Sequence, residues 1–409
     1  IRMTRRLFRV CVPVVAQFRC IRSRRVHDEI PREGTVSGAP EGTVYVGLSL
    51  QKALQVAIIG APNVGKSLLS NQVVKAAVSA VSSCMDTTTK NVVCALTEEE
   101  VQLVVVDSPG TVGVTHAKKH SGQKEIVAEP EAALANAHHI VVVQDATALG
   151  DYIHHRVIHL LHRHSHLPST LVMNKVDLVT LRSDLLQLTR ILTRNQVAGR
   201  PIQTIQRPIG NLGRAGDCRA NTMKLHGDWL AEKTPEWQAK YRALVATPSA
   251  RAGFADTRRL FLSEPGWPSF SAVFFCSALT GEGIDDLRRH LLSLAQDSPW
   301  RLPDSAVTTK SPQSICEESV RAALLDCAPS YLAYNMRPKV SEWVEDEEVL
   351  QVVVDVECAK EREARAILGK GGARISEVGQ RVNDHMSTLF QRQLFVRILV
   401  KVEGKVYDQ

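Results

Sequence analysis

The stretch QVAIIGAPNVGKSLL, residues 55–69, joins a short apolar run to a glycine-rich loop and then to a helix-like segment. Residues 60–67 match G-x-x-x-x-G-K-S at every fixed position. In that pattern backbone N–H groups near Gly60 and Gly65 surround phosphates, Lys66 contacts the β- and γ-phosphates, and Ser67 ligates Mg²⁺. The stretch therefore predicts a nucleotide-phosphate loop, and the alternative is a strand-to-helix turn that uses glycine only for tightness.

Short apolar runs that end in polar residues recur beyond this loop. They are VAIIG, LVVVD, IVVVQD, TLVMNK and VFFCS, and helix-like stretches separate them. Nearly all-apolar strands are typical of a parallel sheet that helices cover on both faces. We therefore predict an α/β domain with a mainly parallel sheet. Ligands gather at the carboxyl ends of such strands.

Three of these strand ends carry groups that suit a guanine nucleotide. VVVDSPG places Asp107 to hold Mg²⁺ through water and the Gly110 N–H to meet the γ-phosphate. NKVD, residues 174–177, offers Asp177 to the N1–H and 2-amino donors of guanine, which adenine lacks, and Lys175 can lie along the base. SAL, residues 277–279, can present an N–H to the guanine O6. Together with the phosphate loop, these elements predict a site for GTP and GDP with Mg²⁺.

The segment CMDTTTKN, residues 84–91, supplies a candidate switch threonine. We select Thr88 as the residue that senses the γ-phosphate through Mg²⁺, with Thr87 as the alternative because the register is open. Thr111 follows Gly110 where many small GTPases carry a water-orienting glutamine, which predicts slow hydrolysis. The predicted catalytic residues are Lys66, Thr88, Asp107 and Gly110, and the predicted metal ligands are Ser67, Thr88 and Asp107. The predicted GTP-binding residues are Gly60, Ala61, Pro62, Asn63, Val64, Gly65, Lys66, Ser67, Leu68, Asp107, Gly110, Asn174, Lys175, Asp177, Ser277, Ala278 and Leu279.

A second glycine cradle, AILGKGGARI at residues 366–375, lacks the phosphate-loop spacing and any following carboxylate–magnesium element. It fits the G-x-x-G turn of a KH domain, where a nucleic-acid backbone approaches closely. A helix, two strands, a helix, this turn, a helix and a strand follow one another, as in the type II KH domain of ribosome-associated proteins. The alternative is a helix C-cap followed by a new helix. The predicted RNA-binding residues are Ile367, Leu368, Gly369, Lys370, Gly371, Gly372, Arg374 and Ile375.

Composition limits the other possibilities. The net charge of +7 tolerates a polyanionic partner without requiring one, and no apolar run is long enough to span a bilayer. The first residues carry no acidic side chain before Asp28, and arginine recurs at positions 2, 5, 6, 9, 19, 22, 24 and 25. This composition predicts a mitochondrial transit peptide, and the alternative is a basic arm that touches RNA. The histidine-rich stretch at residues 162–167 is interpreted as a solvated helix end rather than a metal site.

The two cradles together resemble the Era family, in which a translation-factor-related GTPase domain precedes a KH domain. The likeness rests on the threonine pair of the switch, NKVD, SPW at residues 298–300, YN at residues 334–335 and ILGKGG, and it runs from about Gln55 to Val402 apart from one insertion. With the presequence, the chain is most similar to mitochondrial Era-like GTPases. Thr89 departs from the family's usual arginine and Ser108 from its usual threonine.

The resemblance implies a GTP-gated RNA chaperone that binds small-subunit mitochondrial ribosomal RNA and assists assembly of the small ribosomal subunit in the matrix. The open alternatives are a GTPase serving RNA modification and a nucleotide-gated RNA-binding scaffold with little hydrolysis. We expect a monomer, and the basic charge leaves a peripheral contact with the inner membrane open. The expected domains are residues 1–48 (transit peptide and linker), 49–298 (GTPase domain with a partly disordered insertion at about 195–267), 299–312 (linker) and 313–409 (KH domain).

Overall fold

The structure is a computed structural model, and all the residues it describes lie within the compact unit Leu50–Gln409. The described ranges are 51–84, 87–111, 125–147, 151–202, 230–231, 233–346, 349–402 and 405–407. The predicted transit peptide and linker, residues 1–48, fall outside them. Among the described residues, no helix is both long enough and apolar enough to cross a bilayer.

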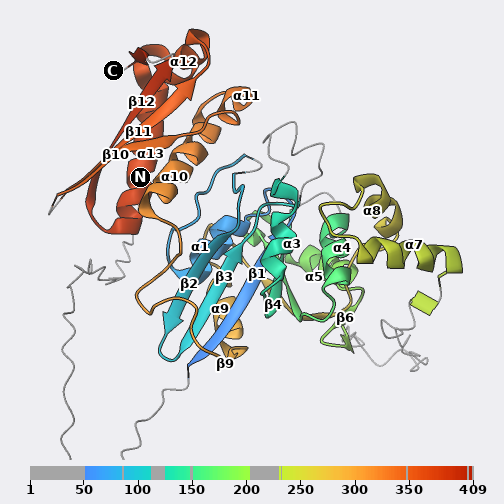
Figure 1. Ribbon diagram of the computed structural model, residues 1–409. Coiled ribbons are helices and arrows are strands. Elements are labelled where there is room, and N and C mark those ends of the chain that lie inside the picture. Colours follow the sequence, from blue (N-terminus) through green and yellow to red (C-terminus); the bar gives the residue numbers. More distant parts are fainter. Residues whose placement is uncertain are drawn as a thin grey trace, which may run out of the picture. The chain divides into compact units, whose positions relative to one another are not determined.

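A seven-stranded sheet forms the centre of the N-terminal part (Figure 1). Its strand order is β2-β3-β1-β4-β5-β8, and the short β9 pairs with β1. The five predicted apolar runs form the parallel strands, whereas β2 and β9 run antiparallel to their neighbours. This confirms the predicted mainly parallel α/β fold. The strands are β1 (Lys52–Gly60), β2 (Val92–Glu98), β3 (Val101–Asp107), β4 (His139–Asp145), β5 (Ser169–Asn174), β8 (Phe270–Phe275) and β9 (Gln296–Asp297).

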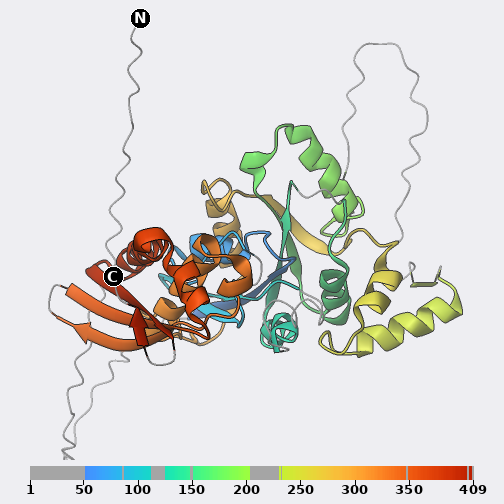
Figure 2. The same ribbon diagram turned by 90° about the horizontal axis from the view of Figure 1, so that it is seen from above.

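Helices cover both faces of this sheet (Figures 1 and 2). Successive residues of β1 point in opposite directions, so Val56 and Ile58 join one apolar cluster while Ala57 and Ile59 join another. The first cluster packs beneath α1 (Lys66–Val74) and α9 (Ile284–Ser293). The second packs beneath α3 (Glu129–Leu134), α4 (His155–Arg163) and α5 (Arg182–Leu192). Burial on both faces explains why the strands read as nearly unbroken apolar runs. Two single 3₁₀ turns, η1 (Glu125–Val127) and η2 (Val176–Leu178), lie between these elements.

The insertion at about 195–267 contains more regular structure than the sequence interpretation allowed. Its described part forms the hairpin β6 (Gln196–Val197)–β7 (Arg200–Pro201) and the helices α7 (Pro235–Ala246) and α8 (Phe254–Phe261). The start of α7 carried a readable signal, because the Thr234 hydroxyl accepts from the Trp237 N–H at 3.3 Å and Pro235 stands in the first turn. Both helices pack on the cluster beneath α4, so they extend the core of the N-terminal part. Residues 203–229 lie outside the described ranges.

The C-terminal part is the predicted α+β unit. Its sheet has the order β10-β11-β12-β13, with β11 and β12 parallel and the outer pairs antiparallel. Ser311 caps α10 as expected, since its hydroxyl accepts from the Ser314 N–H at 3.2 Å. The small helix α11 and strand β13 were not anticipated. The elements are α10 (Pro312–Cys327), α11 (Ser330–Ala333), β10 (Lys339–Glu345), β11 (Val349–Cys358), α12 (Glu361–Leu368), η3 (Lys370–Gly372), α13 (Ala373–Phe390), β12 (Gln393–Val402) and β13 (Lys405–Tyr407).

Candidate functional site

The predicted phosphate loop turns from the end of β1 into the start of α1. Gly65 has φ +88°, and a Cβ atom there would lie 2.4 Å from the Asn174 side-chain nitrogen. A Cβ atom on Gly60 would lie 2.4 Å from the carbonyl oxygen of Val143 in β4. Both positions therefore require glycine, one for its conformation and both for space. The two glycines let the loop pass close to the sheet and leave its N–H groups for a ligand.

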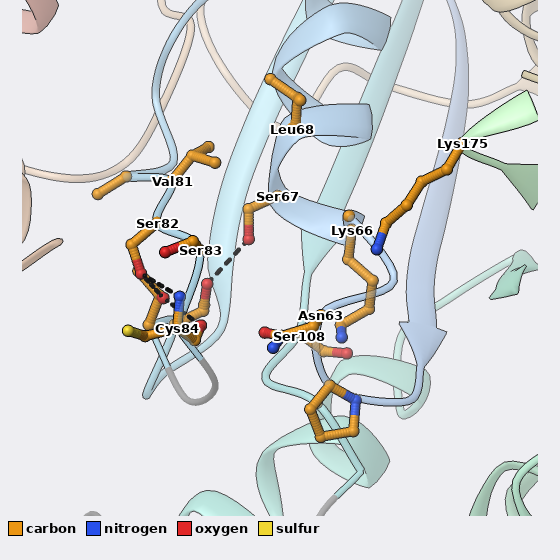
Figure 3. A pocket seen from close by; sticks show the side chains of 16 residues that line it. Asn63, Lys66, Ser67, Leu68, Val81, Ser82, Ser83, Cys84, Ser108 and Lys175 are labelled. Atoms are coloured by element: carbon orange, nitrogen blue, oxygen red, sulfur yellow. Dashed lines mark hydrogen bonds between the residues drawn. The ribbon is translucent and has the colours of Figure 1, made fainter. Parts of the chain in front are cut away.

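A cavity of about 390 Å³ lies in front of this loop (Figure 3). Lys66 and Ser67 enter it from the start of α1, and Lys175 enters it from the end of β5. The buried Lys66 ammonium donates to the carbonyl oxygen of Ala61 at 2.9 Å, within the loop itself. The cavity thus has two cations and a serine hydroxyl on its walls, which suits a polyphosphate with a divalent cation.

The residues chosen as metal ligands come together from three segments. The hydroxyls of Ser67 and Thr88 lie 2.9 Å apart, whereas the Thr87 hydroxyl bonds to Ser82 and to the carbonyl oxygen of Cys84. Asp107 ends β3 fully buried, and neither of its carboxylate oxygens has a hydrogen-bond partner. A buried carboxylate without a hydrogen-bond partner, close to the Ser67 hydroxyl that in turn lies beside Thr88, fits a hard cation such as Mg²⁺. This geometry favours Thr88 over Thr87.

Burial also sets the protonation behaviour of Asp107. Burial in the protein interior raises the pKa of its carboxyl, and the nearby Ser67 hydroxyl and Lys66 ammonium act in the opposite direction. A divalent cation would stabilise the charged form in the same way as Lys66 does. A buried carboxylate at this position is therefore better explained as a metal ligand than as a charged group without a partner.

The base side of the cavity is built around Asn174. Its side-chain N–H₂ donates to the Val64 carbonyl at 2.8 Å, and its side-chain oxygen accepts from the Ala278 N–H at 2.9 Å. One amide therefore joins the phosphate loop to the loop that follows β8. Asp177 and Leu279 are exposed at this edge, where a ligand can reach them.

Asp145 is a site residue that the sequence reading missed. It ends β4, and its carboxylate accepts from the Lys175 ammonium at 2.7 Å, while the Thr147 N–H donates to its other oxygen at 2.8 Å. Lys175 itself has φ +65°, an unusual conformation that positions its side chain. Burial favours a raised pKa for Asp145, but the bonds from Lys175 and Thr147 outweigh burial and lower that pKa. The polar ending of IVVVQD was the available signal.

Gly110 lies directly against the phosphate loop, as its predicted role requires. A Cβ atom at Gly110 would lie 2.8 Å from the Cα atom of Pro62. The next residue, Thr111, donates its N–H to the Gly60 carbonyl at 3.1 Å, and its hydroxyl lies 3.5 Å from His154 Nδ1. The D-x-x-G segment is thereby fixed to the start of the loop.

A groove of about 530 Å³ lies on the C-terminal unit between the G-x-x-G turn, α13 and β12. Gly369, Gly371 and Gly372 all have positive φ, and nothing lies within 4 Å of a Cβ built at Gly371 or at Gly379 of α13. The groove surface at Gly371 and Gly379 therefore has no side chain in the way, so the backbone of a ligand can approach it closely. The lining residues are Gly371, Gly372, Ile375, Ser376, Gly379, Gln380, Asn383, Phe395, Val396, Arg397 and Ile398.

Some predicted RNA-binding residues do not line this groove. Ile367 and Leu368 were expected in an apolar floor, but both are buried in the C-terminal core, because α12 turns that face toward the sheet. The Arg374 guanidinium donates to the Ala366 carbonyl at the end of α12 instead of standing free. The sequence reading missed Phe395, whose ring is 66% exposed in the groove, and Asn383, whose side-chain oxygen is buried without a partner.

The switch segment is hydrogen-bonded to α10 within the same compact unit. Asp326 accepts from the backbone N–H and the hydroxyl of Ser83 at 2.8 and 2.7 Å. The Arg321 guanidinium donates to the carbonyl oxygen of Thr87 at 2.7 Å, one residue before Thr88. The segment that carries the candidate metal-sensing threonine thus contacts the first helix of the C-terminal unit.

The histidine-rich stretch is only in part the solvated helix end that the sequence suggested. His166 is exposed, but His162 is buried against Phe261 and Trp267, and its Nδ1 lies 2.9 Å from the Tyr241 hydroxyl. The helices of the insertion supply this burial, which the interpretation did not anticipate. Within the described ranges, no three His, Cys, Asp or Glu side chains cluster as a metal site would require.

Known proteins resemble this chain over nearly its whole length. Residues 55–175 match the family model of the 50S ribosome-binding GTPases. "GTPase Era, mitochondrial" of Caenorhabditis elegans is 46% identical over 384 residues, covering 91% of this chain and 96% of that protein. The protein of the same name from Salmo salar is 32% identical and covers 86% and 77%, respectively.

The structure gives the same grouping by fold. Era in complex with MgGDPNP and nucleotides 1506–1542 of 16S ribosomal RNA has a TM-score of 0.60 with this chain and 19% sequence identity. The similarity covers 87% of this chain and 95% of that one. The fold, the motif order and the identity to the worm and salmon proteins agree. The chain therefore belongs to the mitochondrial GTPase Era family.

Proposed function

We infer that this GTPase binds small-subunit ribosomal RNA in the mitochondrial matrix and assists assembly of the small ribosomal subunit, with GTP and Mg²⁺ as its ligands. The main support for the proposal is that one chain has both an open groove lined by glycines in the C-terminal unit and a cavity at the phosphate loop. The names of the worm and salmon relatives support the mitochondrial location, and the solved Era complex supports the class of RNA.

In the nucleotide site each residue has a defined task. The N–H groups of the loop from Gly60 to Ser67 and the Lys66 ammonium bind the phosphates, while Asp177 accepts from the guanine edge. Ser67, Thr88 and Asp107 would hold Mg²⁺, and the bound cation would neutralise negative charge on the phosphates. Through its two hydrogen bonds, Asn174 fixes the loop after β8, on the base side, relative to the phosphate loop. Fixed donors of this kind stabilise the transition state without reorganising.

Hydrolysis is expected to be slow. Thr111 stands where a water-orienting glutamine would, and its hydroxyl is directed to His154 and the Gly60 carbonyl. No water-orienting side chain follows Gly110 directly, which suits a switch better than a high-turnover enzyme.

The C-terminal groove suits single-stranded RNA. Unstacked bases can lie over Gly379 and against the exposed Phe395 ring, while Lys370 and Arg397 neutralise phosphates. Asn383 also lines this groove, where its side-chain amide could bond to a base edge. The bonds from α10 to Ser83 and Thr87 provide the route by which the γ-phosphate would influence this unit. Because the same segment bears Thr88, its rearrangement on hydrolysis would break or remake those bonds.

Replacing Lys370 and Gly371 with aspartates tests the RNA half of the proposal. Two carboxylates beside the incoming phosphates should weaken binding of single-stranded ribosomal RNA by about a hundredfold or more at low salt, and the loss should shrink as salt rises. GTP affinity and basal hydrolysis should hardly change. A folded variant that binds RNA at parental affinity but loses bound nucleotide would overturn the KH assignment.

A further inference from the structure

The lobe made by α7 and α8 carries an excess of positive charge, and these cations have no role in the nucleotide site or the KH groove. Residues 235–263 contain five cationic and two acidic side chains, and all seven are exposed. Among the described residues, the guanidinium groups of Arg251, Arg258 and Arg259 make no hydrogen bond or ion pair, although the Arg251 backbone N–H donates to the Pro248 carbonyl at 2.9 Å. The cations are Lys240, Arg242, Arg251, Arg258 and Arg259, and the acids are Glu236 and Asp256.

One face of α8 combines these cations with apolar side chains. Phe254, Arg258 and Leu262 follow at i, i+4 and i+8, so they share the outward side of the helix. The adjoining side of α8, with Thr257, Leu260 and Phe261, is buried in the GTPase core. We call the exposed set Arg251, Phe254, Arg258, Arg259 and Leu262 the α8 face.

Phe254 is placed as a stacking platform. Its side chain is 44% exposed, and its ring centroid lies 4.5 Å from that of His155 in an edge-on contact. Burial lowers the pKa of His155 to about 3, and the charges of His154, Arg156 and Arg258 act in the same direction. An exposed aromatic ring with an arginine one helical turn away, as Phe254 has in Arg258, is an arrangement on which nucleobases can stack.

Buried charged groups hold the α7–α8 turn in place. The Arg156 guanidinium donates to the carbonyl oxygens of Ser249 and Ala252 at 3.0 and 3.1 Å, on either side of Arg251. Glu131 accepts from the Ser249 N–H at 2.6 Å and from the Arg163 guanidinium. The turn that presents Arg251 is therefore fixed by side chains from α3 and α4. Such preorganisation reduces the entropy lost when a ligand binds.

We propose that the α8 face is a second RNA-binding surface, separate from the KH groove, that grips the phosphates and one unstacked base of the same ribosomal RNA. This step rests on the proposed function for the identity of the RNA. Arginine favours RNA because its planar group pairs with phosphate at two points and stacks on bases. An anionic bilayer is the weaker candidate, since the apolar side of α8 faces the core and leaves no continuous surface to enter lipid.

The test compares three full-length variants. The first replaces Arg251, Arg258 and Arg259 with glutamine, and the matched control replaces the exposed cations Lys52, Lys75 and Arg289 with glutamine. The third is the Lys370→Asp, Gly371→Asp variant of the KH turn. Each is titrated with a transcript of small-subunit ribosomal RNA, with a short single-stranded RNA that can fill only the KH groove, and with vesicles of phosphatidylcholine and cardiolipin.

Loss of three phosphate contacts should weaken binding of the transcript about tenfold to a hundredfold near 0.1 M salt. The negative slope of log K against log salt should become shallower by about 2. Binding of the short RNA, GTP affinity and thermal unfolding should stay at parental values, and the control variant should change little. If the KH variant binds the short RNA normally, the proposed KH site fails, yet the α8 face is still judged by its own effect on the transcript. Unchanged transcript affinity and slope, an equal loss in the control, or a loss confined to the vesicles would each overturn the proposal.

Discussion

The hydroxyl oxygens of Ser67 and Thr88 lie 2.9 Å apart, although 21 residues separate them in the chain. Thr87, the neighbouring candidate, directs its hydroxyl back to Ser82 and Cys84 within its own segment. Two adjacent hydroxyls, one of which lies close to the buried Asp107 carboxylate, are suited to share one cation. The pair therefore distinguishes two threonines that the sequence left as alternatives.

Thr88→Val should lower the rate of GTP hydrolysis about a hundredfold, because it removes one fixed ligand of the charge-neutralising cation. GDP affinity should change little, since the γ-phosphate is the group that this segment senses. Single-turnover hydrolysis at saturating GTP and Mg²⁺ measures the effect. Thr87→Val is the matched control, and a larger loss in the control than in Thr88→Val would reverse the assignment.

Asp177→Asn should weaken GTP binding and favour xanthosine triphosphate, whose 2-oxygen can accept from the new amide. Two charge-assisted hydrogen bonds are lost, which is worth on the order of 3 kcal/mol, or roughly a hundredfold in Kd. Competition titrations with both nucleotides on the parent and the variant provide the measurement. Parental affinity for GTP in the variant would refute the base-recognition role of Asp177.

Gly379→Leu should act in opposite directions on stability and on RNA binding. A Cβ atom at Gly379 meets nothing within 4 Å, so a better helix former should stabilise α13 by about 0.5–1 kcal/mol. The same side chain would project into the groove and lower RNA affinity.

Urea unfolding and RNA titration of the same preparation separate these two effects. Thr388→Leu, at an exposed α13 position outside the groove, is the control and should leave RNA binding unchanged. Undiminished RNA binding by Gly379→Leu would remove α13 from the interface.

Glu131 should make stability depend on pH in the acid range. Burial acts to raise its pKa, but bonds with His164, Arg163 and the Ser249 N–H outweigh burial and lower that pKa from 4.5 to about 2. A depressed pKa in the folded state contributes stability that is present above the unfolded value and is lost as pH falls toward the folded value. The relevant window therefore runs from about pH 4.5 down to about 2.

Glu131→Gln should destabilise the protein by about 1–2 kcal/mol at pH 7 after solvent screening, and the difference from the parent should narrow below pH 4.5. Urea unfolding at pH 7, 5, 4 and 3.5 measures the difference. A constant difference at every pH would mean that the carboxylate charge is not the source of the stabilisation.

Local patterns were sufficient to predict most of the fold. The apolar runs fixed the five parallel strands, and the spacing around Gly60, Asp107 and Asn174 placed the nucleotide site at their carboxyl ends. Helix α7 was missed because it is only weakly amphipathic, although Thr234 and Pro235 marked its start. Helix α8 is short but amphipathic, so its apolar period was a signal that the sequence interpretation did not use. Ile367 and Leu368 were misplaced because a helix next to a binding turn still needs a face for its own core.

Residues that act through tertiary contacts could not be assigned from the sequence. Asp145 becomes relevant only because β4 and β5 are neighbours, which brings its carboxylate to Lys175. Phe395 and Asn383 belong to a strand and a helix that meet only in the folded unit. For such residues the sequence shows only a polar residue at the end of a strand or an aromatic residue on an alternating strand. The side chains that they contact become known only with the topology of the sheet.

The parallel pairing of β11 with β12 has a consequence for how the chain reaches its native state. Every residue of β11 from Val349 to Cys358 finds its partner between Gln393 and Val402, beyond two helices and the glycine turn. The central strand pair cannot close until Gln393–Val402 is available, because the loop that it closes contains all of α12 and α13. A chain that is made or delivered from its N-terminus would therefore complete the nucleotide cradle first, and it would gain its RNA groove only when β12 arrives.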